Sequence, residues 1–118
     1  MKKVLIVDDA AFVRMRYAKS LQSGGFLTEE ATNGAEAITK YKKDRPDGVL
    51  LDINMPVMNG LITLHEIMNM DPKARVAMVT CIGSQSIVLT ALKTGARDFV
   101  TKPMGDDGLL NTVEKLLA

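Results

Sequence analysis

The residues of this sequence that are best suited to chemistry follow short apolar runs of strand character. Asp8 and Asp9 follow the first such run, Asp52 follows another, and two more lead into Thr80 and Lys102. Carboxylates, a hydroxyl and an ammonium can together hold a divalent cation and an anion. Mg²⁺ suits this set best, because it prefers carboxylates, waters and phosphate oxygens, and no His-Cys cluster favours zinc. The sequence therefore predicts a magnesium and anion site, provided that the fold brings these strand ends together.

Each of these residues also has a simpler interpretation when it is taken alone. Asp8 or Asp9 could cap the following helix, and Asp52 could belong to a turn. Thr80 could merely end a strand, and Lys102 could be a solvated loop residue. Three carboxylates within about 5 Å would repel by roughly 3 kcal/mol per pair at an effective dielectric constant of about 20. A marginally stable domain is not expected to carry that repulsion without a cation.

Short apolar segments alternate along the chain with longer segments that have apolar residues at helical spacing. Strands are expected at Lys3–Val7, Phe26–Ala31, Gly48–Leu51, Arg75–Thr80 and Asp98–Thr101. Between and after them, the following apolar residues should face the sheet: Val13, Tyr17 and Leu21; Ala37, Ile38 and Tyr41; Leu61, Leu64, Ile67 and Met68; Ile87, Val88, Ala91 and Leu92; Leu109, Val113 and Leu116. This alternation predicts an α/β fold, an open parallel sheet with helices on both faces and a ligand site at the carboxyl ends of its strands.

Length and composition limit the class of protein. The 118 residues predict one domain over residues 1–118. Fifteen Lys and Arg against fourteen Asp and Glu leave a net charge of +1, which indicates neither a nucleic-acid nor a membrane surface. The single cysteine, Cys81, excludes an intrachain disulfide and favours a cytoplasmic location. The apolar run at 4–7 is too short for a signal peptide, which supports the same location.

These residues carry a resemblance that covers the whole chain. The sequence resembles a response-regulator receiver domain, on segments 4–9, 33–37, 46–60, 79–80 and 95–103. Segments 9–14 and 30–34 are further similar to stand-alone chemotaxis regulators of the CheY type. The resemblance implies a doubly wound, flavodoxin-like sheet with strand order 2-1-3-4-5.

For the site, the resemblance implies that Asp52 accepts a phosphoryl group from a histidine kinase of the CheA type. Asp8, Asp9, Asp52 and the backbone carbonyl of Asn54 would surround Mg²⁺. Lys102 would screen the charge of the transferring group. The chain would then be no enzyme with a separate substrate, but a phosphoacceptor switch that catalyses only its own phosphotransfer and autodephosphorylation.

The resemblance also implies a switch. Thr80 would donate to a phosphoryl oxygen, and the pull on its loop would let Phe99 turn inward. This movement would alter the surface formed by the fourth helix, the fifth strand and the fifth helix. Cys81, beside Thr80, could crowd the path of Phe99, and plain core packing is the alternative interpretation of this cysteine. The residues that would flank the phosphoryl group are Asn54, Cys81 and Ile82.

Two further positions complete these expectations. A cis peptide bond before Pro103 is implied by the family alone, since most X-Pro bonds are trans. His65 should be a surface residue of the third helix and no phosphorylation site, because nothing places it at the strand ends.

The implied output is binding to another protein, which is a flagellar motor switch protein or another output protein. A phosphatase is a further expected partner, and the chain is expected to be a monomer. A phosphorelay intermediate, or a regulator in another pathway, remains an alternative.

A different class, a magnesium-dependent phosphohydrolase of the haloacid dehalogenase kind, is disfavoured. Such enzymes carry a second Asp two residues after the nucleophile, where this chain has Asn54, which cannot shuttle a proton. A flavin or nucleotide carrier is disfavoured because no glycine-rich phosphate loop follows the first strand.

Overall fold

Five strands alternate with five helices in the computed structural model, which describes residues 1–81, 84–102 and 104–118. The strands are β1 (Lys3–Val7), β2 (Leu27–Ala31), β3 (Gly48–Leu51), β4 (Val76–Thr80) and β5 (Asp98–Thr101). The helices are α1 (Ala11–Ser23), α2 (Gly34–Asp44), α3 (Gly60–Met70), α4 (Gln85–Thr94) and α5 (Asp106–Leu117). No helix in the described ranges is both long and apolar enough to cross a membrane.

Two strand boundaries differ by one residue from the sequence prediction. Phe26 lies before β2, because its backbone N–H donates to the carbonyl of Leu21 and so belongs to the turn that closes α1. Arg75 lies before β4, although its carbonyl already accepts a hydrogen bond from the backbone of Val49. The other three strands match the prediction at both ends.

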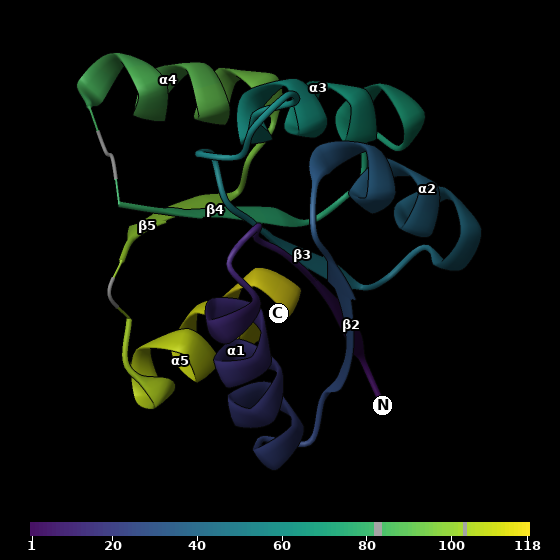
Figure 1. Ribbon diagram of the computed structural model, residues 1–118, viewed down its shortest axis with the longest axis vertical. Helices are drawn as coiled ribbons and strands as arrows, with labels where there is room; N and C mark the ends of the chain where they lie inside the picture. Colours follow the sequence, from purple (N-terminus) through teal and green to yellow (C-terminus); the bar gives the residue numbers. More distant parts are fainter. Residues whose placement is uncertain (82–83, 103) are drawn as a thin grey trace.

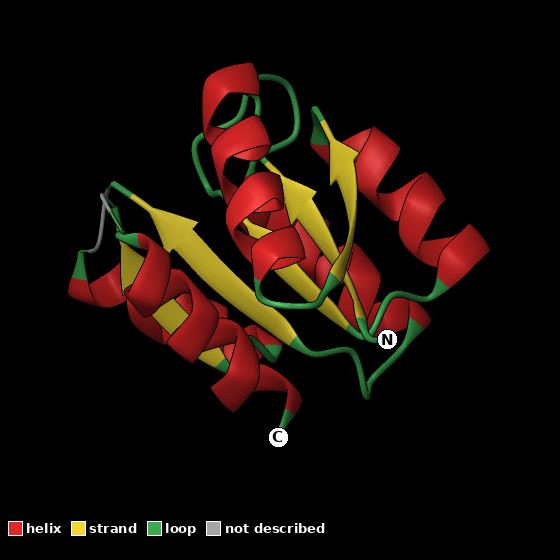
Figure 2. Ribbon diagram, turned by 90° about the horizontal axis from the view of Figure 1, so that it is seen from below, coloured by secondary structure: helices red, strands yellow, loops and turns green. Residues whose placement is uncertain are grey.

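The five strands form one parallel sheet in the order β2-β1-β3-β4-β5, which confirms the expected fold class. Helices α2, α3 and α4 cover one face of the sheet, and α1 and α5 cover the other (Figures 1 and 2). The chain passes from β1 to β2 on one side of β1, and then crosses from β2 to β3 on the other side. A topological switch point therefore lies where β1 and β3 end side by side.

The core consists of two apolar layers, one on each face of the sheet. Leu5 and Val7 of β1 pack in the layer under α2, α3 and α4, whereas Val4 and Ile6 pack in the layer under α1 and α5. All four side chains are buried. This burial on both faces explains why the strand sequence is continuously apolar rather than alternating.

The expected inward stripe of α4 is only partly correct. Ala91 is buried and Ile87 is partly buried, but Leu92 is 44% exposed. Position 92 lies about 100° further around the helix than position 91, and α4 presents only a narrow face to the sheet. Leu89 is 48% exposed on the same helix, so α4 carries apolar side chains on its outer surface.

Asn-Gly pairs begin two of the helices, α2 and α3. The side chain of Asn33 accepts a hydrogen bond from the backbone N–H of Glu36 at 2.8 Å, and that of Asn59 accepts from Ile62 at 3.0 Å. An asparagine oxygen satisfies backbone N–H groups that a helix start otherwise leaves unpaired. These caps fix where α2 and α3 begin after β2 and β3.

Val57, in the loop between β3 and α3, has a strained backbone. Its φ of 70° lies in the left-handed region, and its side chain is fully exposed. A β-branched residue in this region costs on the order of 1–3 kcal/mol, and here no buried contact offsets the cost.

Replacing Val57 by Asn should therefore raise the free energy of unfolding by about 1 kcal/mol, because Asn tolerates left-handed backbone angles. Urea denaturation of the metal-free protein would measure the gain. The control is Val57→Ala, which lacks the polar side chain that lets Asn hydrogen-bond locally in the left-handed region, and it should gain less. A Val57→Asn variant less stable than the parent would refute the strain argument.

Tyr41 and Asp71 link α2 to the end of α3. The Tyr41 hydroxyl donates to Asp71 Oδ2 at 2.8 Å, and Arg45 Nη1 lies 3.2 Å from the same oxygen. The hydrogen bond from Tyr41 lowers the pKa of Asp71 below its ordinary value. The ionised carboxylate therefore stabilises the fold above the pKa of Asp71 in the unfolded chain. This stabilisation is lost as the pH falls through the lower, folded-state pKa.

Replacing Tyr41 by Phe should cost about 1 kcal/mol at neutral pH, since Asp71 is partly exposed and solvent weakens the interaction. The difference in stability between variant and parent should shrink as the pH falls through the lowered pKa of Asp71, where its carboxylate becomes protonated. Urea unfolding over a pH series would measure it. A difference that stays constant down to the acid limit of folding would show that the charge of Asp71 is not involved.

Candidate metal and phosphoryl site

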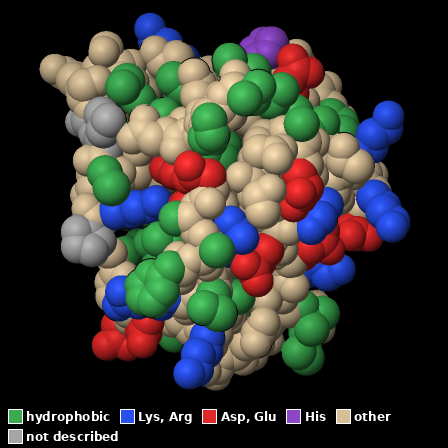
Figure 3. Space-filling view, viewed as in Figure 1, with side chains coloured by type: hydrophobic (Ala, Val, Ile, Leu, Met, Phe, Trp, Pro, Cys, Tyr) green, Lys and Arg blue, Asp and Glu red, His purple; other side chains and the backbone are tan. Residues whose placement is uncertain are grey.

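The register of the parallel sheet brings the acidic residues together. Val7 at the end of β1 pairs with Leu51 at the end of β3, so Asp8 and Asp52 leave the sheet side by side. One oxygen from each of Asp8, Asp9 and Asp52 lies within 4.8 Å of the others. Figure 3 shows acidic side chains beside a basic one over this end of the sheet.

Asp52 is buried, and the space on its inner side excludes water. Only 5% of the residue is exposed. The space between Asp52, Asp8 and the apolar residues Leu50 and Val79 has no room for a water molecule. Burial raises the pKa of Asp52, and the charge of Asp8 adds to the rise while Lys102 opposes it. The backbone N–H of Asn54 lies 3.4 Å from Asp52 Oδ1.

Lys102 is the cation that faces these carboxylates. Thr101 at the end of β5 pairs with Thr80 at the end of β4, and Lys102 comes next in the chain. Its Nζ donates to Asp8 Oδ2 at 2.6 Å and lies 3.6 Å from Asp52 Oδ2. Burial alone would lower the pKa of Lys102, but the hydrogen bond to Asp8 and the charge of Asp52 raise it above its ordinary value. Lys102 therefore remains charged and compensates the buried carboxylates.

Asp8 is held on its other side by the start of α1. Its Oδ1 accepts a hydrogen bond from the backbone N–H of Ala10 at 2.9 Å. Arg14 Nη1 donates to the carbonyl of Asp8 at 2.7 Å, and Arg14 Nε pairs with Glu30 at 3.2 Å. Asp8 thus forms a local turn before α1 and contacts Lys102 as well, but its simpler interpretation as a helix cap is wrong, because the N-cap residue of α1 is Ala10 and no side chain caps this helix.

Arg14 was not predicted as a site residue. It ties the segment after β1 to the end of β2 and so fixes the backbone of Asp8. The sequence signal is an arginine five residues after Asp9 with a glutamate near the end of the neighbouring strand, but such a pair is common on protein surfaces.

Gly60 fits against the segment that carries Asp52. Its backbone N–H donates to the carbonyl of Ile53 at 2.9 Å. A Cβ at Gly60 would collide with the backbone of Asp52 and Ile53. The first turn of α3 can therefore press directly onto the chain next to Asp52, which limits the freedom of that residue.

The remaining predicted site residues lie at or near the same edge. Thr80 is fully buried at the end of β4, and Asn54 is exposed after β3. Phe99 pairs with Met78 and packs, partly buried, against the layer under α2, α3 and α4. Cys81 is exposed, so its interpretation as a core residue is wrong: the chain has already left the sheet there. Predictions for Ile82 and Pro103 fall outside the described residues.

His65 lies on α3 and is exposed, as expected. Its ring nitrogen Nδ1 lies 3.9 Å from Glu66 and 3.4 Å from the side-chain amide of Asn69, both on the same helix. It takes no part in the cluster of carboxylates.

Comparison with known proteins gives the class. The family model described as the response regulator receiver domain matches residues 4–114. The chemotaxis protein CheY of Thermotoga maritima is 44% identical over 116 residues, which cover 98% of this chain and 97% of that protein. CheY of Bacillus subtilis is 46% identical with the same coverage. The chain therefore belongs to the response-regulator receiver family.

Solved structures agree with this result. Chemotaxis protein CheY4 of Vibrio cholerae superposes with a TM-score of 0.95 at 32% identity, and the match covers 99% of both chains. A CheX-CheY-BeF3-Mg²⁺ complex from Borrelia burgdorferi contains a match with a TM-score of 0.95 at 37% identity, covering 99% of this chain and 90% of that one. Within its family, the chain is a CheY-like, two-component response regulator, a phosphoacceptor switch rather than a conventional enzyme.

Proposed function

We propose that Asp52 accepts a phosphoryl group from a histidine kinase and that the acyl phosphate switches the binding of an output protein in chemotaxis. The observation that carries this proposal is the convergence of Asp8, Asp9 and Asp52 within 4.8 Å, with the ammonium of Lys102 beside two of them. Such a site has hard oxygens for a cation and a positive group for the transferred phosphoryl group.

The donor set fits Mg²⁺. Asp8, Asp9 and Asp52 supply carboxylate oxygens that one ion could share, and the backbone carbonyl of Asn54 would add a fourth oxygen. When bound, the ion would offset the repulsion among the carboxylates and the charge of the phosphoryl group. Lys102 alone compensates only part of that charge.

Asp52 would attack the phosphorus of a phosphohistidine. A bond forms between a carboxylate oxygen and phosphorus, the phosphorus–nitrogen bond breaks, and its electron pair leaves with the imidazole. Lys102 Nζ lies 3.6 Å from Asp52 Oδ2, and from beside Asp52 its ammonium can pair with a phosphoryl oxygen. Thr80 would donate its hydroxyl to another phosphoryl oxygen. Autodephosphorylation is the later attack of water on the acyl phosphate, and Asn54 and Ile82 would flank its approach.

The new contacts of Thr80 would favour an active state in which Phe99 turns inward. The phosphoryl group can shift this equilibrium only by the difference in its contacts between the two states. Exposed Leu89 and Leu92 belong to α4, which together with β5 and α5 would form the output surface.

The similarity to CheY proteins supports a proposal for the partners. A histidine kinase of the CheA type would supply the phosphoryl group, and a flagellar motor switch protein would receive the signal. The solved CheX-CheY complex supports a further protein partner, such as a phosphatase. We propose a monomer of one receiver domain over residues 1–118 that acts in the cytoplasm.

Intact-mass measurement after incubation with a small-molecule phosphodonor tests this proposal. With Mg²⁺, the parent should gain the mass of one phosphoryl group, and with EDTA it should gain none. An Asp9→Asn variant should need more Mg²⁺ for half-maximal uptake, because it loses one anionic oxygen ligand. Uptake that is equal with Mg²⁺ and with EDTA would contradict the proposed metal site.

A further inference from the structure

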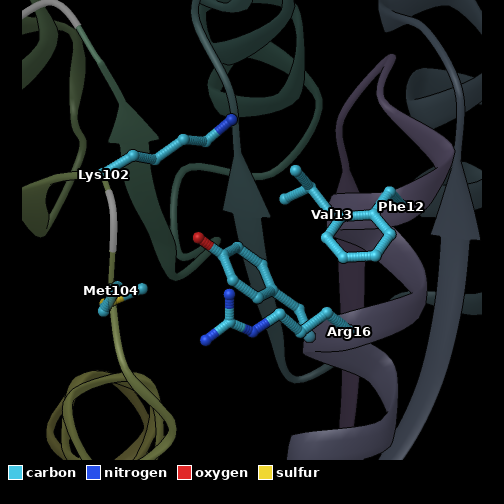
Figure 4. Close-up of a pocket in the computed structure, with 6 residues that line it drawn as sticks. Phe12, Val13, Arg16, Lys102 and Met104 are labelled. Atoms are coloured by element: carbon cyan, nitrogen blue, oxygen red, sulfur yellow. The ribbon is translucent and has the colours of Figure 1, made fainter.

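Tyr17 of α1 lies next to the acidic cluster, and the mechanism above gives it no role. Only 6% of the residue is exposed. It lines the tight space behind Asp8 and Asp52. It also lines a second cavity, of about 110 Å³, whose other lining residues are Phe12, Val13, Arg16, Lys102 and Met104. Figure 4 shows Lys102 reaching from the end of β5 across this cavity, opposite Phe12, Val13 and Arg16 of α1.

No hydrogen bond of the Tyr17 hydroxyl is found among residues 1–81, 84–102 and 104–118, and this oxygen is not one of the fully enclosed side-chain atoms that lack a partner, so it remains accessible from the cavity. A phenol that is this deeply buried normally has a partner, as Tyr41 has in Asp71. Burial raises the pKa of Tyr17, and the charges of Lys102 and Asp8 also act on it, so the neutral phenol is close to both. Tyr17 therefore places a neutral hydroxyl beside the acidic cluster, and this hydroxyl is available to accept a hydrogen bond.

Lys102 and Mg²⁺ require the same carboxylate. The ammonium of Lys102 donates to Asp8 Oδ2 at 2.6 Å, and Asp8 is also a proposed ligand of the ion. Two cations at one carboxylate repel each other strongly in a partly buried site. Mg²⁺ binding must therefore move the ammonium of Lys102 away from Asp8, and the ammonium then needs another acceptor.

We infer that the Tyr17 hydroxyl accepts a hydrogen bond from the Lys102 ammonium when Mg²⁺ occupies Asp8, and thereby keeps the ammonium beside Asp52. Tyr17 lines the same cavity as Lys102, so a change in the lysine side chain alone can bring the two groups together. A phenol oxygen accepts from an ammonium without adding negative charge to the site. Tyr17 is then a positioning residue, and this inference rests on the proposed metal site.

A double-mutant cycle on Mg²⁺ affinity tests the inference without any measurement of phosphotransfer. The dissociation constant of Mg²⁺ would be measured by NMR titration with MgCl₂ for the parent, Tyr17→Phe, Lys102→Met and the double variant. Tyr17→Phe should bind Mg²⁺ at least about fivefold more weakly, because displaced Lys102 loses a charge-assisted hydrogen bond. In the Lys102→Met background, Tyr17→Phe should have no effect, since no ammonium has to be accommodated.

Two controls separate this effect from packing. Tyr17→Leu should weaken Mg²⁺ binding as Tyr17→Phe does, and Tyr41→Phe, at the other tyrosine, should leave it unchanged. Without Mg²⁺, Tyr17→Phe should be about as stable to urea as the parent, because it keeps the buried ring and removes a hydroxyl for which no hydrogen bond is found within the described residues.

Three outcomes would overturn the inference. Equal Mg²⁺ affinity of Tyr17→Phe and the parent would show that the hydroxyl is not used. An equal loss of affinity with and without Lys102 would show that Tyr17 acts through packing. A parent that binds no Mg²⁺ would remove the proposed metal site, and the role of Tyr17 would be lost with it.

Discussion

An Asp52→Asn variant should lose phosphoryl uptake, with a rate reduced on the order of a thousandfold or more, because the amide has no anionic oxygen to attack phosphorus. The fold should remain intact. Asn has the shape of Asp, and its amide oxygen can still accept the hydrogen bond that the backbone of Asn54 donates to Asp52. Time courses of intact mass with a small-molecule phosphodonor and saturating Mg²⁺ would measure the rate.

The matched control for this variant is Asp9→Asn. Asp9 belongs to the same cluster but is exposed to solvent. Asp52 is only 5% exposed, and the space beside it has no room for a water molecule. The Asp9→Asn variant should take up the phosphoryl group more slowly than the parent at low Mg²⁺. Its uptake rate should approach the parental rate when the Mg²⁺ concentration is raised, since Asp52, the nucleophile, is unchanged. Uptake by Asp52→Asn at the parental rate would assign the phosphoryl group to another residue.

Replacing Lys102 by Met should destabilise the metal-free protein by about 3 kcal/mol, because it removes one partner of a buried charge pair. The Lys102 side chain is 14% exposed and compensates carboxylates that are 4% and 6% exposed, in Asp8 and Asp52. Without the ammonium, the repulsion between these two carboxylates is uncompensated. Saturating Mg²⁺ should restore most of the stability and should bind more tightly than to the parent, since no ammonium competes for Asp8.

Urea unfolding with EDTA and with MgCl₂ would measure both effects. Lys93→Met is the control, because Lys93 is an exposed lysine on α4. It should change stability only slightly and should not alter the response to Mg²⁺. A Lys102→Met protein as stable as the parent in EDTA would show that Lys102 does not hold the acidic cluster together.

Much of the site could be predicted because its residues follow strands directly. In a parallel sheet all the carboxyl ends lie at one edge, so Asp8, Asp52 and Lys102 are forced together once their strands are recognised. The apolar runs of β1, β3 and β4 are short and continuous, which made those strands easy to recognise. The order of the strands came from family resemblance, since local sequence does not determine which strands are neighbours.

What could not be predicted depends on side-chain reach and on backbone angles. Tyr17 matches the inward stripe of α1, and its spacing gives no sign that its hydroxyl borders the acidic cluster. The left-handed backbone conformation of Val57 could not be predicted either, because valine normally avoids positive φ angles. Leu92 was expected to be inward because period counting cannot tell how wide a face α4 presents to the sheet.

The most direct test of the account is to locate the phosphoryl group within the chain. Borohydride reduces an aspartyl phosphate to homoserine, which peptide mass spectrometry can assign to one residue. After incubation with phosphodonor and Mg²⁺, the account predicts homoserine at position 52 and none in the EDTA sample. Homoserine at the position of Asp8 or Asp9 instead, or a phosphoryl group on His65 that borohydride does not convert, would contradict the assignment of Asp52 as the phosphoacceptor.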